Sequence, residues 1–250
     1  MNWKLLAWRC ENATTPDSNM KHPVIIGAGG VASYLVPVLL KTFRPQSLTI
    51  IDKDVLEERN LDRQMFDPIS IGENKAGALA SKHRFEPTEG ILASHWPTKI
   101  ISIPDWFSDS TELPDDIDAI ICCADNHEAR YAAMQRAKAL GIYAYIGGNE
   151  FLDSQAFVYH QDFEGTPRDP LVRYPNIATD TEGSPFRCTG EAQLASPQLA
   201  IANLSCAAKL LHLLWIYERW VPENRWGLTP KTIAGLPCEL FTSLAENSSL

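Results

Sequence analysis

The sequence predicts an α/β protein with a Rossmann-like, mostly parallel sheet, helices on both faces of that sheet, an antiparallel C-terminal extension and a crossover loop. Three observations support this fold class. Short apolar runs rich in β-branched residues alternate with helical patterns through residues 22–150, as expected for a parallel sheet. A glycine-rich turn separates the first such run from the first helical pattern. After residue 150 the alternation stops, and a long polar segment precedes one apolar helix.

The first half of the chain is expected to supply most of the sheet. Strands are predicted at residues 24–26, 48–51, 91–95, 118–123 and 142–146. Helices are predicted at residues 32–43, 73–85 and 125–140. Pro37 lies inside the first helix, where it removes a backbone donor and is expected to kink the helix, at a cost of about 3 kcal/mol unless the kink is accommodated.

The second half has a looser pattern. It predicts an antiparallel strand at residues 155–159, an apolar helix at 197–215 and a final strand at 239–244. Residues 162–187 are rich in Pro, Gly, Asp and Thr, which predicts a long surface loop. Loops of that length in compact domains are often functional. The chain therefore divides into a lead-in at residues 1–21 and a single domain at 22–250, whose two halves are 22–150 and 151–250.

Bulk composition counts against several classes of protein. The chain has 250 residues, of which 45% are hydrophobic and 21% charged, as in ordinary globular proteins. Its formal net charge of -9 counts mildly against a nucleic acid as the main partner, because surfaces that bind nucleic acids usually need a basic face. No window approaches the roughly 20 apolar residues that span a bilayer, and the first ten residues lack the core and cleavage site of a signal peptide. We therefore expect a cytoplasmic protein.

The 6 cysteines do not form any CxxC pair. Neither a disulfide framework nor a paired-cysteine zinc site is therefore expected, and we predict no zinc. Cys122 and Cys123 fall in an apolar strand and Cys206 on the apolar helix, so all three are expected in the core.

The glycine-rich turn is the first candidate site. Gly27, Gly29 and Gly30 follow a strand and precede a helix, with the G-x-G-x-x-G/A spacing that ends on Ala32. Glycines let the backbone approach a phosphate, and the helix N-terminus offers unpaired N–H groups. Asp52 ends the next strand at about the 20-residue offset expected for a ribose-binding acid. This pattern predicts nucleotide binding but leaves NAD, FAD, S-adenosylmethionine and ATP open.

A polar and cationic block after Asp52 favours ATP among these nucleotides. Arg63 can grip phosphate oxygens with two parallel hydrogen bonds, and Lys75 adds a point charge near the start of a helix. Asn60 and Gln64 add neutral polar contacts. A dinucleotide oxidoreductase has no need of such a cluster beyond its ribose acid. The alternative interpretation is a solvated charged loop.

Several motifs in order resemble the ThiF/MoeB superfamily of ubiquitin-activating-like adenylyltransferases. These motifs are the glycine turn followed by Ala32-Ser33, Asp52-x-Asp54, Asn60-Leu61-x-Arg63-Gln64, Gly72-x-x-Lys75 and Asp125-Asn126-x-x-x-Arg130. Asp54 is followed directly by Val55, which departs from the spacing of the family motif. The resemblance covers residues 24–146 firmly and 147–215 loosely. Gly148-Asn149 and residues 187–192 are most similar to small bacterial members of the PRTRC type.

The resemblance implies a role for each matched residue. Asp52 would hold the ribose hydroxyls, with Asp54 and Asn126 also at the nucleotide. Asn60, Arg63, Gln64 and Lys75 would surround the phosphates, and Asp125 would help to hold Mg²⁺ near the α-phosphate. Arg63, Lys75 and Asp125 would thus be the catalytic residues. From the sequence alone, Asp125 is also suited to cap the helix that follows it.

Cys188 is a further candidate. Some family members use a cysteine near this position to accept the activated acyl group, and a cation such as Arg187 favours a thiolate. Other members do not require their cysteine, and the alternative interpretation of Cys188 is a small structural residue. The resemblance further implies that the crossover loop covers the bound tail of a carrier protein, and that the protein is a homodimer.

The leading functional hypothesis is therefore ATP-dependent adenylation of the C-terminal carboxylate of a small ubiquitin-like or sulfur-carrier protein. Activation of a peptide or a tRNA substrate at the same ATP site is the first alternative. A catalytically weak, nucleotide-binding partner in an assembly is the second.

Overall fold

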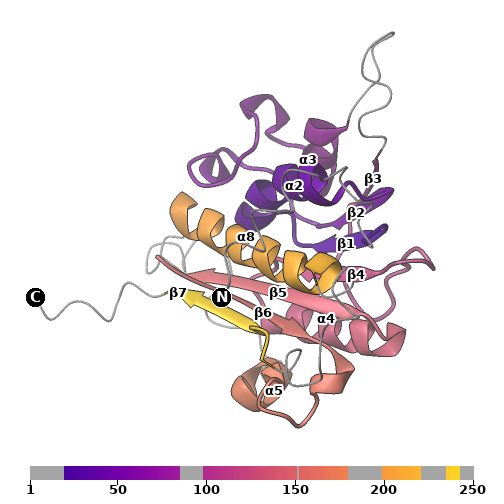
Figure 1. The fold of residues 1–250 in the computed structure, drawn as a ribbon. Helices are drawn as coiled ribbons and strands as arrows, with labels where there is room; N and C mark the ends of the chain where they lie inside the picture. Colours follow the sequence, from indigo (N-terminus) through magenta and orange to yellow (C-terminus); the bar gives the residue numbers. More distant parts are fainter. Residues whose placement is uncertain (1–19, 85–97, 151, 180–198, 221–234, 243–250) are drawn as a thin grey trace, which may run out of the picture.

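The computed structural model describes residues 20–84, 98–150, 152–179, 199–220 and 235–242 (Figure 1). They form an α/β fold built on one 7-stranded sheet, in the order β3-β2-β1-β4-β5-β6-β7. The first five strands run parallel: β1 (Pro23–Ile26), β2 (Ser47–Ile51), β3 (Lys99–Ile103), β4 (Ala119–Cys122) and β5 (Tyr143–Glu150). The last two, β6 (Asp153–Tyr159) and β7 (Glu239–Thr242), are antiparallel additions. The predicted fold class is confirmed.

One strand was missed at the sheet edge. β3 pairs with β2 so that Ile50 lies opposite Ser102, whereas the sequence pattern predicted the third strand at residues 91–95. That predicted segment lies outside the described residues. The apolar run at 100–103 is short and begins after Lys99, so its pattern alone does not stand out from a loop.

The helices cover both faces of the sheet, as predicted. On one face lie α2 (Gly30–Phe43), α3 (Lys75–His83) and α8 (Ala200–Leu214), which pack on Ile25, Ile50 and Val158. On the other face lie α4 (His127–Leu140) and the short helices near residue 177, which pack on Ile26, Ile120 and Tyr159. Figure 1 shows α8 crossing β5 and β6. The helix α2 runs through Pro37, whose ring lies on its exposed side.

The first part of the expected surface loop is folded. Residues 161–179 contain the 3₁₀ turn η3 (Gln161–Phe163) and the helices α5 (Pro170–Arg173) and α6 (Asn176–Thr179), and they bury Phe163 and Ile177. Asp169 caps α5 by accepting a hydrogen bond from the Leu171 N–H at 2.9 Å. Tyr174 stacks on Phe157 with 5.9 Å between ring centroids. The prediction of a plain loop was wrong here because local caps and buried aromatics fix these turns. Residues 180–187 lie outside the described part.

The helix α8 corrects one statement about hydropathy. The helical segment Ala200–Arg219 is long and apolar enough to cross a membrane by length and composition alone, with a mean hydropathy of 1.3 over its window. Seven of the α8 side chains are buried, and the helix packs in the same cluster as the sheet and α2. Its apolar character is that of a core helix. A π-helical turn, η4 (Trp215–Trp220), continues it.

Candidate functional site

A cavity of about 530 Å³ opens at the carboxyl ends of β1, β2 and β4. Open parallel sheets place their ligands at this edge. Nine of the predicted site residues line it: Gly27, Gly29, Gly30, Asp52, Asp54, Gln64, Lys75, Asp125 and Asn126. The structure therefore brings together residues that are up to about a hundred positions apart in the sequence.

The glycine turn has a backbone that other residues would not tolerate. Gly27 has a φ of 88°, and its N–H donates to the Ile51 carbonyl at 2.8 Å. A Cβ at Gly27 would lie 2.9 Å from the Ala124 nitrogen, which is backbone and cannot move aside. The turn therefore packs flat against the loop after β4, and α2 begins directly at Gly30. Its geometry suits the close approach of a phosphate.

Asp52 is fixed at the end of β2 by backbone donors. Its carboxylate accepts the Ala28 N–H at 2.6 Å and the Asp54 N–H at 2.8 Å. Burial raises the pKa of this carboxyl group above its usual value, and those two hydrogen bonds and nearby Lys75 oppose the rise. The side chain thus joins the glycine turn to the following loop and still has lone pairs to offer a ligand.

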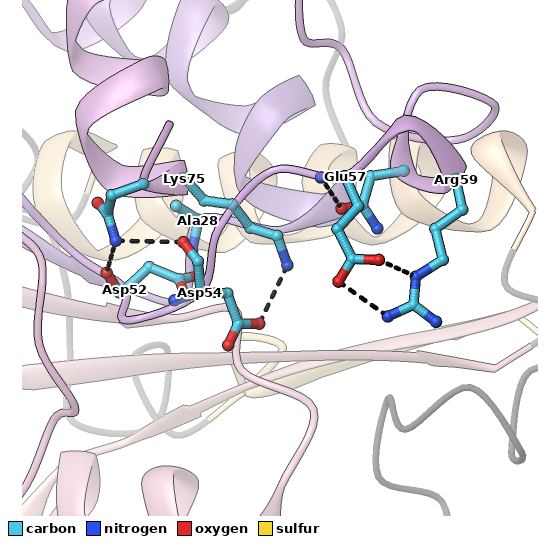
Figure 2. Close-up of polar contacts among 8 residues, drawn as sticks. Ala28, Asp52, Asp54, Glu57, Arg59 and Lys75 are labelled. Carbon is cyan, nitrogen blue, oxygen red and sulfur yellow. Dashed lines mark hydrogen bonds and ion pairs between the residues drawn. The ribbon is translucent and has the colours of Figure 1, made fainter. Parts of the chain in front are cut away.

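Asn74 holds the next part of this wall. Its amide N–H groups donate to the Asp52 and Asp54 carbonyls at 2.7 and 3.1 Å, and its oxygen caps α3 by accepting the Gly77 N–H at 3.0 Å. Lys75, the first residue of α3, reaches Asp54 with an Nζ–Oδ2 distance of 3.0 Å (Figure 2). Only 12% of the Lys75 side chain is exposed. We call Asp52, Asp54, Asn74 and Lys75 the β2-side wall.

Two predicted phosphate ligands are not on the cavity lining. Asn60 is buried, and its amide oxygen accepts the Glu57 N–H at 3.0 Å within a capping box. The Arg63 guanidinium donates to the Arg59 carbonyl at 2.7 Å and to Asp62 at 2.9 Å. Asn60 therefore shapes the loop, and the Arg63 side chain folds back on that loop in this structure.

Gln64, the neighbour of Arg63, does line the cavity. Its side-chain Oε1 is buried and has no hydrogen-bond partner among the described residues. Buried polar atoms in native proteins almost always have a partner, so an orphaned one at a cavity wall indicates a ligand or water. The two ends of the amide can exchange places by a flip, which allows Gln64 to accept or to donate.

The opposite wall is formed by the ends of β4 and β5 and the start of α4. Asp125 is exposed here. Asn126 caps α4 by accepting the Ala129 N–H at 2.8 Å, so the cap is Asn126 and not Asp125. Arg130 donates from Nε to the Ala124 carbonyl at 3.3 Å, and its guanidinium occupies the space that a Cβ on Gly148 would need. We call Asp125, Asn126, Arg130 and Asn149 the β4–β5 wall.

The lining residues that were not among the predicted site residues include Trp106, Arg130, Asn149 and Asn203. Arg130 closes the Asp125-Asn126-x-x-x-Arg130 motif, so its signal was present in the sequence. Trp106 is 39% exposed and has the Lys53 ammonium 3.9 Å from its ring centroid. The positions of Trp106, Asn149 and Asn203 along the sequence do not predict that they line the same site.

Three of the described cysteines, Cys122, Cys123 and Cys206, are not activated nucleophiles. Burial raises the pKa of Cys122 to about 11 and of Cys206 to about 12, and it raises the pKa of Cys123 as well. These thiols stay protonated at neutral pH, as expected for core residues. Cys123 also touches the cavity. Cys188 lies outside the described residues.

Comparison with known proteins agrees with this architecture. The model of the ThiF family matches residues 17–236. A comparison with curated proteins gave no significant match.

Solved structures with the same fold include three named proteins. Selenomethionine PaaA has a TM-score of 0.58 at 17% identity, over 90% of this chain and 61% of PaaA. Escherichia coli MccB with AMPCPP and MccA has a TM-score of 0.53 at 17% identity, over 80% of this chain and 57% of MccB. E. coli tRNA N6-threonylcarbamoyladenosine dehydratase, TcdA, in complex with AMP has a TM-score of 0.59 at 15% identity, over 82% of this chain and 89% of TcdA. The chain spans only 61% and 57% of PaaA and MccB, and at these identities the likeness is one of fold.

Proposed function

Because this chain belongs to the ThiF family, we propose that it binds ATP in the cavity and uses it to adenylate a carboxylate. The acyl substrate that we propose is the C-terminal carboxylate of a small ubiquitin-like or sulfur-carrier protein. The observation that carries the proposal is a single cavity that joins the glycine turn and Asp52 to Lys75 and Asp125. Gln64 Oε1, which is buried in the same cavity and has no hydrogen-bond partner among the described residues, supports the binding of a polar ligand there.

The arrangement suits ATP more than a dinucleotide. The glycine turn and the start of α2 offer backbone N–H groups to phosphates, and Asp52 offers acceptors to ribose hydroxyls. Lys75 is the cation of the β2-side wall, where it forms an ion pair with Asp54. A phosphate would take over from Asp54 as the partner of Lys75. Arg63 would have to leave Asp62 to reach the same phosphates, and because most of Asp62 is exposed, that ion pair is weak.

In the proposed reaction, a carboxylate oxygen of the acyl substrate attacks the α-phosphorus of ATP. A bond forms between them, the bond from the α-phosphorus to the bridging oxygen breaks, and pyrophosphate leaves with that electron pair. Lys75 and Arg63 would stabilise the charge that builds on the phosphate oxygens. The walls of the cavity would align the two reactants, which supplies much of the rate enhancement in such transfers.

Asp125 fits a role at magnesium. Magnesium in nucleotide sites is typically held by one or two carboxylates together with phosphate oxygens. Among the described residues no three His, Cys, Asp or Glu side chains gather into a metal site, so phosphates would have to complete the coordination. When bound, the ion would neutralise charge on the phosphates. Asp125 itself is exposed at the cavity edge, where such an ion is accessible.

The identity of the acyl substrate is the finer part of the proposal. We include in it a PRTRC-type member, a homodimer, a cytoplasmic location and a crossover loop that covers the carrier tail. Cys188 either accepts the acyl group or is a structural residue, in which case the adenylate itself is the product. Activation of a peptide or a tRNA substrate at the same ATP site is the alternative, since the fold is shared with MccB, solved with MccA, and with the tRNA enzyme TcdA. A catalytically weak partner in an assembly would keep only the nucleotide binding.

Two measurements test the proposal. Calorimetric titration should give binding of ATP with magnesium and no binding of NAD; tight NAD binding without ATP binding would overturn the proposed nucleotide. ATP–pyrophosphate exchange should then appear only when a carrier protein ending in a free carboxylate is added, and a carrier with its last residue amidated is the matched control. Exchange with a peptide or tRNA instead of a carrier would select the alternative substrate.

A further inference from the structure

Helix α8 places one polar residue in the cavity. Asn203 lies in the first turn of this helix, in the second half of the chain, and its exposed fraction is 0%. It is the described residue of α8 that lines the cavity. A fully buried asparagine is costly unless its amide is hydrogen-bonded, so its partners indicate why it is there.

The Asn203 amide contacts three separate elements. Its Nδ2 donates to the Arg63 carbonyl at 3.0 Å. Its Oδ1 accepts from the Asn149 side chain at 3.0 Å, at the end of β5. The amide also fills the space beside Gly30, where an added Cβ would lie 2.3 Å from Nδ2. One side chain thus touches the loop after β2, the β4–β5 wall and the start of α2.

The hydrogen bond to the Arg63 carbonyl fixes backbone rather than side chain. It holds the main chain of Arg63 and Gln64 beside the glycine turn, and the Arg63 guanidinium remains able to swing from Asp62 towards the cavity. The nearby Met65 N–H donates to the Ser33 hydroxyl at 3.0 Å, so side chains from α8 and α2 together hold this part of the loop. The hydrogen bond to Asn149 ties the same amide to the opposite wall, so Asn203 sets the spacing across the site.

We propose that Asn203 is a positioning residue for the phosphate end of the ATP site: it holds the Arg63–Gln64 backbone and Asn149 at fixed places around the glycine turn. This inference rests on the proposed function, because it assigns a role to the cavity as an ATP site. It predicts that ATP binding requires both the Nδ2 donor and the Oδ1 acceptor of the Asn203 carboxamide. Leucine has a similar shape but neither hydrogen-bonding group, and aspartate keeps the acceptors but loses the donor to the Arg63 carbonyl.

The test uses the whole chain with Asn203→Leu and Asn203→Asp, and Ser205→Ala as the matched control. Ser205 lies on the same helix and bonds to Ser154 and Lys209 instead of the cavity. Both Asn203 variants should weaken ATP binding by about 5- to 100-fold, the range for losing a buried hydrogen bond. Ser205→Ala should bind ATP like the wild type. Thermal unfolding must show that each variant is folded at the titration temperature.

A double-mutant cycle separates positioning from general stability. If Asn203 acts by placing Arg63, then Asn203→Leu should weaken ATP binding much less in an Arg63→Ala background than in the wild type. A purely structural role predicts a lower melting temperature with an unchanged ATP affinity, and that result would overturn the inference. Equal losses of affinity in both backgrounds would also overturn it. If the wild type binds no ATP, the proposed function fails and this inference fails with it; wild-type binding with unaltered Asn203 variants defeats this inference alone.

Discussion

The two walls of the cavity differ in how their carboxylates are held. In the β2-side wall, Asp52, Asn74 and Lys75 all have protein partners: backbone N–H groups, backbone carbonyls and the Asp54 carboxylate. In the β4–β5 wall, Asn126, Arg130 and Asn149 also have protein partners, but the Asp125 carboxylate is exposed at the rim. A wall whose groups bond to one another is preorganised, whereas an exposed carboxylate contributes to what binds it and little to the fold. Substitutions in the first wall should therefore lower both stability and binding, and substitution of Asp125 should affect only the reaction.

The largest expected effect is that of Asp125→Ala. Loss of a group that acts on charge developing at the phosphates commonly slows a reaction by about 10²–10³-fold, and we expect that loss in ATP–pyrophosphate exchange. The melting temperature should not change, because the side chain is exposed. Asp115→Ala is the control, an exposed aspartate away from the cavity lining. Wild-type exchange in Asp125→Ala would mean that this wall takes no part in the chemistry.

A third region of the molecule holds a buried acid, Glu218, that does not line the cavity, and it can be compared with the carboxylates of the two walls. Glu218 follows α8 and accepts a hydrogen bond from the Tyr145 hydroxyl at 2.5 Å. Burial raises the pKa of Glu218 from 4.5 to about 7. Because the folded pKa lies above the unfolded one, the contribution to stability is fully present below pH 4.5 and is lost as the pH rises through about 7.

Glu218→Gln should therefore flatten the fall in stability across that pH range. The amide can still accept the Tyr145 hydrogen bond but carries no charge to bury. At pH 8 the variant should be more stable than the wild type by about 1–3 kcal/mol, since one pKa unit is worth about 1.4 kcal/mol. Urea unfolding at several pH values measures this, with the exposed Glu112→Gln as the control. If the free energy of unfolding has the same pH dependence in the wild type and in Glu218→Gln, ionisation of Glu218 does not destabilise the fold, and the prediction is wrong.

Asn74 in the β2-side wall and Asn126 in the β4–β5 wall are both helix caps, so their substitutions allow the stability of the two walls to be compared directly. Asn74 caps α3 and Asn126 caps α4 in the same way, through a side-chain oxygen that accepts a backbone N–H. Replacing either cap by alanine should cost about 1 kcal/mol of stability. Asn74→Ala also removes two hydrogen bonds to the end of β2, so it should cost about 1 kcal/mol more than Asn126→Ala in urea unfolding. Equal losses would mean that the two walls are held alike.

The β2-side wall was also the easier one to predict from sequence. Asp52, Asp54 and Lys75 lie on one stretch of chain, and the parallel strand and its following helix bring them to the same edge of the sheet. The spacing of these residues along the chain is therefore enough to predict most of this wall. The loops around Asp125 were predictable for the same reason, because Asp125 follows the central strand β4 directly.

The remaining features depend on contacts between distant segments. Asn203 bonds to a carbonyl 140 residues away, and that pairing is set by how α8 packs across the sheet. The direction of the Arg63 side chain depends on two local acceptors, so its place in a motif does not fix where its guanidinium points. The folded turns of residues 162–179 were missed because their composition resembles that of a loop, while their stability comes from buried aromatic and aliphatic side chains.

The smallest expected effect tests whether Arg63 turns towards the phosphates. In this structure its guanidinium is paired with Asp62, whose side chain is 72% exposed. Exposed pairs are worth about 0.2–1 kcal/mol, so Asp62→Ala should lower the cost of releasing Arg63 and tighten ATP binding by about 1.4- to 5-fold. Asp67→Ala, which breaks the similarly exposed pair with Lys82, is the matched control and should leave the ATP affinity unchanged. Calorimetric titration of both variants measures the difference. Weaker ATP binding in Asp62→Ala would show the reverse, that Asp62 holds Arg63 in the orientation that binds the nucleotide. The loop would then be preorganised for ATP, as the β2-side wall is.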